Sequence, residues 1–147
     1  MRYVRPIDRE QAAPDSPYVQ GDDAWTAFSA TCIDIHVGSS TICVQPNSTP
    51  APLPWESPVH VITGWNPGQL QTDEANHAAN VALEAALRLT RAQVYPAEGR
   101  ATDGTWAEDS FAVVGLSRID AVSLGRQFGQ LAIFEITAQG IEVLSCA

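Results

Sequence analysis

The chain has 147 residues, of which 45% are hydrophobic, so it is long and apolar enough to fold as one domain with its own core. Its formal net charge is −9, from 17 acidic residues, eight arginines and no lysine, and this field repels the phosphates of nucleic acids. No stretch approaches the roughly 18 apolar residues of a membrane span, and no apolar secretory segment follows Met1. We therefore expect a cytoplasmic protein that contacts neither membranes nor nucleic acid.

The first 22 residues contain prolines and scattered charges without a regular hydrophobic period. We expect residues 1–22 to form a loosely ordered arm. The next apolar stretch, residues 24–30, is typical of a short helical turn that presents Trp25 and Phe28 to the core.

Residues 31–45, TCIDIHVGSSTICVQ, predict a β-hairpin closed by Gly38-Ser39, because glycine at the first central position suits a type II′ turn. This turn pairs Ile35 with Ile42 and Ile33 with Val44 on a core-facing side. The opposite side carries polar residues and two cysteines, and we expect its Asp34 and His36 to face solvent or a neighbouring chain. The members of that side are Cys32, Asp34, His36, Thr41, Cys43 and Gln45.

Residues 46–58 contain five prolines, which cannot donate to a β-ladder, so they predict a stiff surface loop. Over residues 59–146 the periodicities follow the order strand, helix, strand, strand, helix, strand, with one further strand at the end. This order is typical of the split βαβ core of ferredoxin-like domains. We predict a single α+β domain over residues 1–147, with an antiparallel sheet and two helices packed on one face. The hairpin and the final strand would extend that sheet.

Two asparagines stand where the first helix of this core should be apolar. Leu83 and Leu87 form an apolar stripe at four-residue spacing, and the same spacing continued backwards reaches Asn80 and Asn76. Their side chains should face inward, near residues 65–66 at the end of the preceding strand. They either tie down the loop after that strand or line a polar pocket for an anionic or carbonyl group.

A second group of polar and aromatic residues surrounds the turn after the next strand. Trp106, Glu108 and Ser110 alternate onto one face, Glu98 ends the strand before them, and Gln130 is polar in a core-like position. Because the first and third strands of a split βαβ core are neighbours, this group should meet the asparagines at a site partly open to solvent. The alternative is an ordinary solvated hairpin face with one aromatic residue.

The blocks VITGWNPG, WAEDSFAVVGL and FGQLAIF, with the asparagine-bearing helix between the first two, carry a family resemblance. They resemble an uncharacterised bacterial family of small proteins with T-x-W-N-P, W-x-E-x-S-F and F-G-Q-x-A-I stretches. The resemblance covers about residues 60–136 and departs at Gly64, where alanine is expected, and at Leu131. Because that family has no known function, the resemblance implies membership and no activity.

Two functions are consistent with these residues. The first is a small-molecule binder or enzyme in which Glu108 or Glu98 acts as general acid or base, while amides orient a carbonyl or phosphate. Its ligand-binding residues would be Trp65, Asn66, Asn76, Asn80, Trp106, Ser110 and Gln130. The second function is an acidic module without catalytic activity that binds another protein through its sheet or its proline-rich loop.

Nothing in the sequence predicts a cofactor or a metal. Cys32, Cys43 and Cys146 are odd in number and lack C-x-x-C spacing, so buried thiols are the simplest interpretation. A weaker alternative is a metal site or an activated thiol formed by Asp34, His36 and Cys43.

Overall fold

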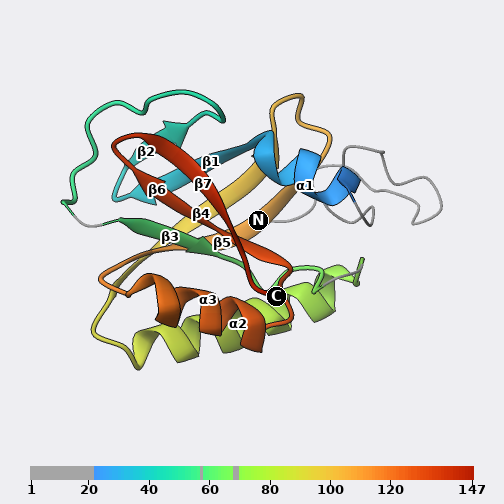
Figure 1. Cartoon of the computed structure of the whole chain (residues 1–147). Coiled ribbons are helices and arrows are strands. Elements are labelled where there is room, and N and C mark those ends of the chain that lie inside the picture. Colours follow the sequence, from blue (N-terminus) through green and yellow to red (C-terminus); the bar gives the residue numbers. More distant parts are fainter. Residues whose placement is uncertain (1–21, 57, 68–69) are drawn as a thin grey trace.

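The computed structural model describes residues 22–56, 58–67 and 70–147 (Figure 1). The arm expected over residues 1–22 therefore lies outside the described residues, except for Asp22, which begins the first helix. The described residues form three helices and seven strands. These are α1 (Asp22–Ser29), β1 (Thr31–Val37), β2 (Ser40–Val44), β3 (Val59–Ile62), α2 (Asp73–Arg88), β4 (Gln93–Ala101), β5 (Ala107–Val114), α3 (Arg118–Gln127), β6 (Ala132–Thr137) and β7 (Gly140–Ser145).

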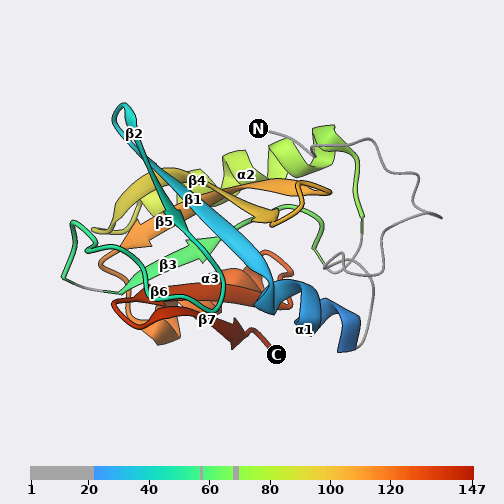
Figure 2. The same ribbon diagram turned by 90° about the horizontal axis from the view of Figure 1, so that it is seen from above.

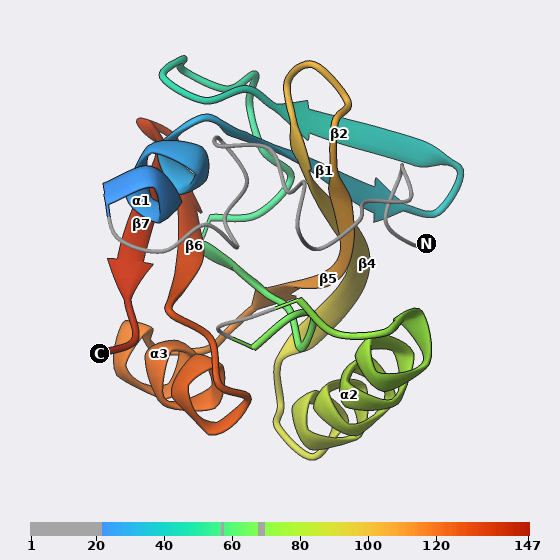
Figure 3. The same ribbon diagram turned by 90° about the vertical axis from the view of Figure 1, so that its right-hand side faces the viewer.

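The strands form one sheet in the order β2-β1-β4-β5-β3-β6-β7, and all neighbouring pairs are antiparallel. The sheet curls into a half-barrel, so the protein is of the predicted α+β class (Figure 3). Strands β3 and β5 are neighbours, as the sequence predicted for the first and third strands of the core. The helical connections β3-α2-β4 and β5-α3-β6 each pass over one intervening strand.

Helices α2 and α3 lie on the same side of the sheet (Figures 1 and 3), whereas α1 lies at the start of β1 (Figure 2). Side chains of α2 and α3, including Leu83, Leu87 and Ala121, share one apolar cluster with strands β3, β5, β6 and β7. We call the side of the sheet that carries this cluster the helix face. A second cluster, which includes Ile33 and Val61, covers the opposite face.

The β1–β2 hairpin has the predicted register. Ile33 pairs with Val44 and Ile35 with Ile42, and Gly38 takes the positive φ of 60° that the turn requires. Asp34 and His36 are partly exposed on the side away from these residues, as expected.

The predicted burial of the three cysteines is wrong at one position. All three are free, but Cys43 is exposed while Cys32 and Cys146 are buried. Cys43 lies on the edge strand β2, so only β1 flanks it within the sheet, whereas β1 and its Cys32 lie between β2 and β4.

The proline-rich segment forms a loop without helix or strand over its described residues 46–56 and 58, as predicted. Leu53 and Trp55 anchor it against the cluster on the opposite face. The indole N–H of Trp55 donates to the Tyr95 hydroxyl at 3.4 Å, so the loop is fastened to β4.

Helix α1 corresponds to the helical turn expected over residues 24–30, but only one of its aromatic residues packs inward. Phe28 contacts Phe134 edge to face at a centroid distance of 6.2 Å. Trp25 is 42% exposed, contrary to the expectation that it would enter the core. Ala27, which is 2% exposed, occupies the inward position between them.

Candidate functional site

The inward asparagines of α2 connect that helix to the chain after β3. Asn80 Oδ1 accepts the backbone N–H of Gly64 at 2.7 Å, and its Nδ2 donates to the backbone oxygen of Asp109 at 2.9 Å. Asn76 Oδ1 accepts the N–H of Asn66 at 2.7 Å, while its Nδ2 donates to Asn66 Oδ1 at 2.9 Å. Both side chains are buried, as their helical spacing predicted. These hydrogen bonds tie down the loop after β3, which is the first of the two roles expected for the asparagines.

Asn66 completes this arrangement. Its φ of 46° lies in the left-handed region, which asparagine tolerates better than most residues. Its Oδ1 also accepts the N–H of Gln71 at 2.8 Å, so one amide oxygen holds both ends of the turn. Gln130 Nε2 donates to the backbone oxygen of Trp65 at 3.1 Å and thereby ties the start of β6 to the same loop.

The second predicted group is divided between the two faces of the sheet. Gly99 pairs with Glu108 across β4 and β5, and Glu98 pairs with Asp109. Because side chains alternate along a strand, Glu98 points to the helix face while Glu108 points to the opposite face. The two carboxyl groups predicted as acid or base therefore do not share a site.

The remaining predicted residues are enclosed rather than partly open to solvent. Trp65, Trp106, Glu108 and Ser110 are all buried. In the described residues, no direct hydrogen bond joins the asparagine amides to Glu98, Glu108 or Ser110; the amide of Asn80 reaches the backbone of Asp109 instead.

A groove of about 200 Å³ lies between α2 and strands β4 and β5. Asn80 and Ser110 both border it, but Ser110 pairs with Ala97 and its side chain points to the opposite face, so its hydroxyl does not face the groove. Its other lining residues are His77, Val81, Glu84, Pro96, Asp109 and Phe111. We call this feature the α2–β5 groove. Sequence reasoning did not identify Asp109, although its position between Glu108 and Ser110 placed it on the other side of β5.

The edge of this groove is acidic. Asp34, Glu98 and Asp109 stand directly beside one another on three adjacent strands, since Asp34 pairs with Glu98 and Glu98 with Asp109. Burial raises the pKa of Glu98, and the neighbouring Asp34 and Asp109 raise it further. Burial also raises the pKa of Asp109, and His77 and His36 oppose that rise. Arg100 relieves part of the repulsion through its Nε, which donates to Asp34 at 2.8 Å.

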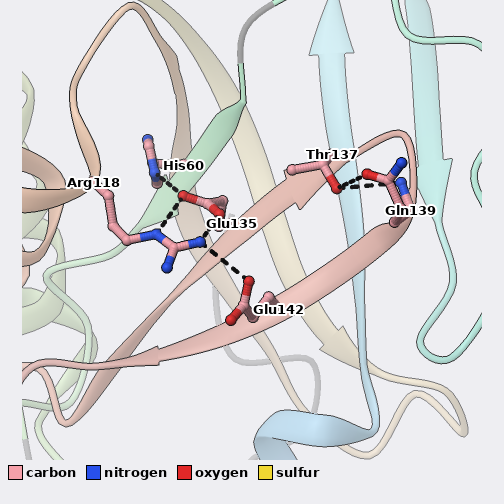
Figure 4. Close-up of polar contacts among 6 residues, drawn as sticks. All are labelled: His60, Arg118, Glu135, Thr137, Gln139 and Glu142. Atoms are coloured by element: carbon pink, nitrogen blue, oxygen red, sulfur yellow. Dashed lines mark hydrogen bonds and ion pairs between the residues drawn. The ribbon is translucent and has the colours of Figure 1, made fainter.

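A network of polar side chains on the helix face, centred on the buried His60 and Glu135, was not predicted (Figure 4). His60 Nε2 lies 2.8 Å from Glu135 Oε2, and both residues are buried. Arg118, the first residue of α3, donates to both oxygens of Glu135 and, at 3.2 Å, to the exposed Glu142. The hydrogen bonds from Arg118, and the contact with His60, hold the pKa of Glu135 below its usual range. The sequence did contain a sign of this network, since His60 and Glu135 are the polar residues within the apolar strands VHVI and AIFEIT.

Neither a metal centre nor an activated thiol is formed by the alternative cluster on the hairpin. In residues 22–56, 58–67 and 70–147, no three His, Cys, Asp or Glu side chains are placed to hold a metal ion. His36 Nδ1 contacts the Thr41 hydroxyl at 3.1 Å. Partial burial and the neighbouring Asp34 raise the pKa of Cys43, which disfavours the reactive thiolate.

Residues 62–133 match the model of a family described as a protein of unknown function (DUF3293). This segment contains every residue predicted for the site and every residue that lines the α2–β5 groove. Searches of curated proteins and of solved structures found no match. None of the helices in the described ranges is long and apolar enough to cross a bilayer.

Proposed function

We propose that this protein binds a small polar molecule in the α2–β5 groove. The observation that carries the proposal is the convergence of Asn80, His77, Glu84 and Asp109 around one hollow of the molecule. Amide, imidazole and carboxylate groups beside apolar surface are the usual lining of a small-molecule site. The match over residues 62–133, which contains this groove, supports assigning the chain to that uncharacterised family.

The charge of the groove selects the class of ligand. Asp109 and Glu84 line it, and Glu98 stands beside Asp109. An anionic ligand, one of the two classes that the sequence favoured, would be repelled by these carboxylates. A cationic amine would be attracted by them. A neutral carbonyl oxygen would accept a hydrogen bond from the protonated form of Asp109, which burial favours by raising its pKa. We therefore propose a cationic or neutral ligand.

The proposal assigns binding and no reaction. Glu108, the carboxyl group predicted as acid or base, faces away from the groove because it pairs with Gly99 rather than with Glu98. The strand order β4-β5-β3-β6, with a helix after β3 and another after β5, supports placing this core among ferredoxin-like split βαβ domains. Such a fold serves many functions, so the site alone carries the functional argument.

Nuclear magnetic resonance titration tests the proposal with chosen probes. Guanidinium, 1,4-diaminobutane and acetamide represent cationic and neutral ligands, and succinate and phosphate represent anionic ones. We expect the cationic or neutral probes to shift amide signals of α2, β4 and β5. Asp109→Asn should weaken binding of a cationic probe by about tenfold, as for loss of one charge-assisted hydrogen bond.

Glu56→Gln is the matched control, because Glu56 is an exposed carboxylate in the proline-rich loop. It removes the same charge from the molecule and should leave probe binding unchanged. Shifts at the groove with succinate or phosphate alone would show that the assigned ligand class is wrong. Absence of shifts with every probe at millimolar concentration would reject the groove as a binding site.

A further inference from the structure

The edge strand β7 borders a second hollow that the proposed function does not use. This cavity of about 390 Å³ lies between α1, the chain after β2, and β7. Trp25 and Phe28 of α1, Pro46 and Asn47, and residues 141–143 of β7 all line it. Its volume is within the range of ligand-binding clefts. We call it the edge groove.

Strand β7 presents a main-chain edge at this groove. Over the described part of the chain, β7 pairs with β6 alone and ends the sheet. Its sequence, GIEVLS, has no proline, lysine or arginine, which are the residues that commonly protect an edge strand from pairing. Because three consecutive residues of β7 line the cavity, the edge and the hollow are continuous.

An aromatic wall stands opposite this edge. Trp25 is 42% exposed and packs edge to face on Phe28 at a centroid distance of 5.7 Å. Phe28 in turn packs on Phe134 of β6, so the wall is fixed to the sheet. An exposed indole held in place in this way offers apolar surface and a face that attracts cations.

The strand that borders the groove also carries an unbalanced negative charge. Glu142 of β7 points to the helix face, away from Trp25, and shares Arg118 with the buried Glu135, so one guanidinium serves two carboxylates (Figure 4). Glu142 keeps 61% of its side chain exposed. With a molecular charge of −9, a second copy of this chain would be repelled from the same place.

We propose that the edge groove binds an extended basic segment of a partner protein, which adds to β7 as an eighth strand. Backbone groups of the segment would pair with the edge of β7, as in other complexes formed by strand addition. An apolar side chain would enter the cavity against Trp25, and a neighbouring arginine or lysine would meet Glu142. The groove lies outside residues 62–133, so this proposal does not depend on the proposed small-molecule site.

A synthetic peptide of alternating arginine and valine tests the proposal with the full chain. Its matched control is the same peptide with alternate backbone nitrogens methylated, which keeps the charge and removes hydrogen-bond donors. We expect the first peptide to shift amide signals of β7 and α1. The methylated peptide should bind at least about tenfold more weakly, because several backbone hydrogen bonds are lost. Equal binding of both peptides would show simple electrostatic attraction and would overturn strand addition.

Protein variants locate the site independently. Trp25→Ala and Glu142→Gln should each weaken peptide binding by about fivefold, as expected for the loss of one cation–π or ionic contact at a partly exposed site. Leu89→Ala is the control, because Leu89 is 89% exposed at the far end of α2. Circular dichroism and thermal unfolding verify that each variant is folded.

Three further results would also reject the proposal. The first is the absence of shifts at millimolar peptide. The second is a set of shifts confined to the α2–β5 groove. The third is a sedimentation measurement that shows a dimer of the free protein which Trp25→Ala dissociates, because the occupant would then be a second copy of the chain.

Discussion

At the scale of single residues, the buried amides explain how α2 is joined to the strand before it. An asparagine side chain carries both an acceptor and donors, so it can bond to two backbone segments at once. Asn80 uses this property to connect Gly64, after β3, with Asp109 in β5. A leucine at this position would continue the apolar stripe of α2 but would leave both backbone groups without their partner.

Asn80→Ala should therefore lower the free energy of unfolding by about 1–3 kcal/mol, since two buried hydrogen bonds are lost. Urea denaturation at constant pH measures the change. His77→Ala, at an exposed position one turn earlier in α2, is the control and should change stability much less. An Asn80→Ala protein as stable as the wild type would contradict the structural role and would leave ligand binding as the reason for the amide.

The row formed by Asp34, Glu98 and Asp109 makes the stability of the fold depend on pH. Burial and two flanking carboxylates raise the pKa of Glu98 above its ordinary value of 4.5. The folded state therefore holds the proton of Glu98 more tightly than the unfolded state does. It follows that this carboxyl group destabilises the fold when ionised, and that the penalty disappears as pH falls through its folded pKa and below 4.5.

Glu98→Gln should raise the free energy of unfolding at pH 7 by about 0.2–1 kcal/mol, a range that allows for solvent screening of like charges on neighbouring strands. The gain should shrink toward zero when the same comparison is made below pH 4.5, where Glu98 is protonated in both states. Chemical denaturation at both pH values measures it. A gain that does not vary with pH would show that neither burial nor the neighbouring carboxylates raise the pKa of Glu98 in the folded state.

At the scale of secondary structure elements, the features that depend on local sequence were predictable. Gly38 determined the hairpin register, and the four-residue spacing along α2 placed Asn76 and Asn80 on its buried side. The register between β4 and β5 was not predictable, because it depends on the length of the turn between Ala101 and Ala107. In the observed register Glu98 and Glu108 point to opposite faces of the sheet. The contact of His60 with Glu135 requires the pairing of β3 with β6, which are distant in sequence.

Close packing of α3 on the sheet gives a prediction for one of its glycines. A Cβ atom at Gly125 would lie 2.6 Å from Ile133 Cγ2 and 2.8 Å from Cys146 Sγ, and both neighbours are buried. Helix propensity alone predicts that Gly125→Ala stabilises α3. We expect instead a loss of about 1–3 kcal/mol, because the methyl group overpacks the core.

Thermal or urea unfolding of Gly125→Ala measures this loss. Ser123→Ala, at an exposed position of the same helix, is the control and should leave stability nearly unchanged. A Gly125→Ala protein more stable than the wild type would contradict close packing between α3 and Ile133 of β6.

At the scale of the whole molecule, four of the five arginines in the described residues form ion pairs or hydrogen bonds within the fold. Arg88 pairs with Glu84, Arg100 with Asp34, and Arg118 with two glutamates. Arg126 donates to the backbone oxygen of Cys146 at 2.9 Å. Because these arginines are bonded within the protein, they are less available to bind phosphate, and the net charge of the chain is already −9. The described surface therefore gives phosphates little compensation for repulsion by the whole molecule.

We expect no binding of DNA or RNA, because affinity for a phosphate backbone depends on the number of cations that displace its counterions. Fluorescence anisotropy with labelled duplex DNA and single-stranded RNA at about 50 mM salt gives the most permissive test, since electrostatic binding is strongest at low salt. Micromolar binding that weakens steeply on addition of salt would contradict the prediction. Arg91→Ala would then be the first variant to examine, since Arg91 lies exposed in the turn before β4, and its loss should reduce the salt dependence if it contacts phosphate.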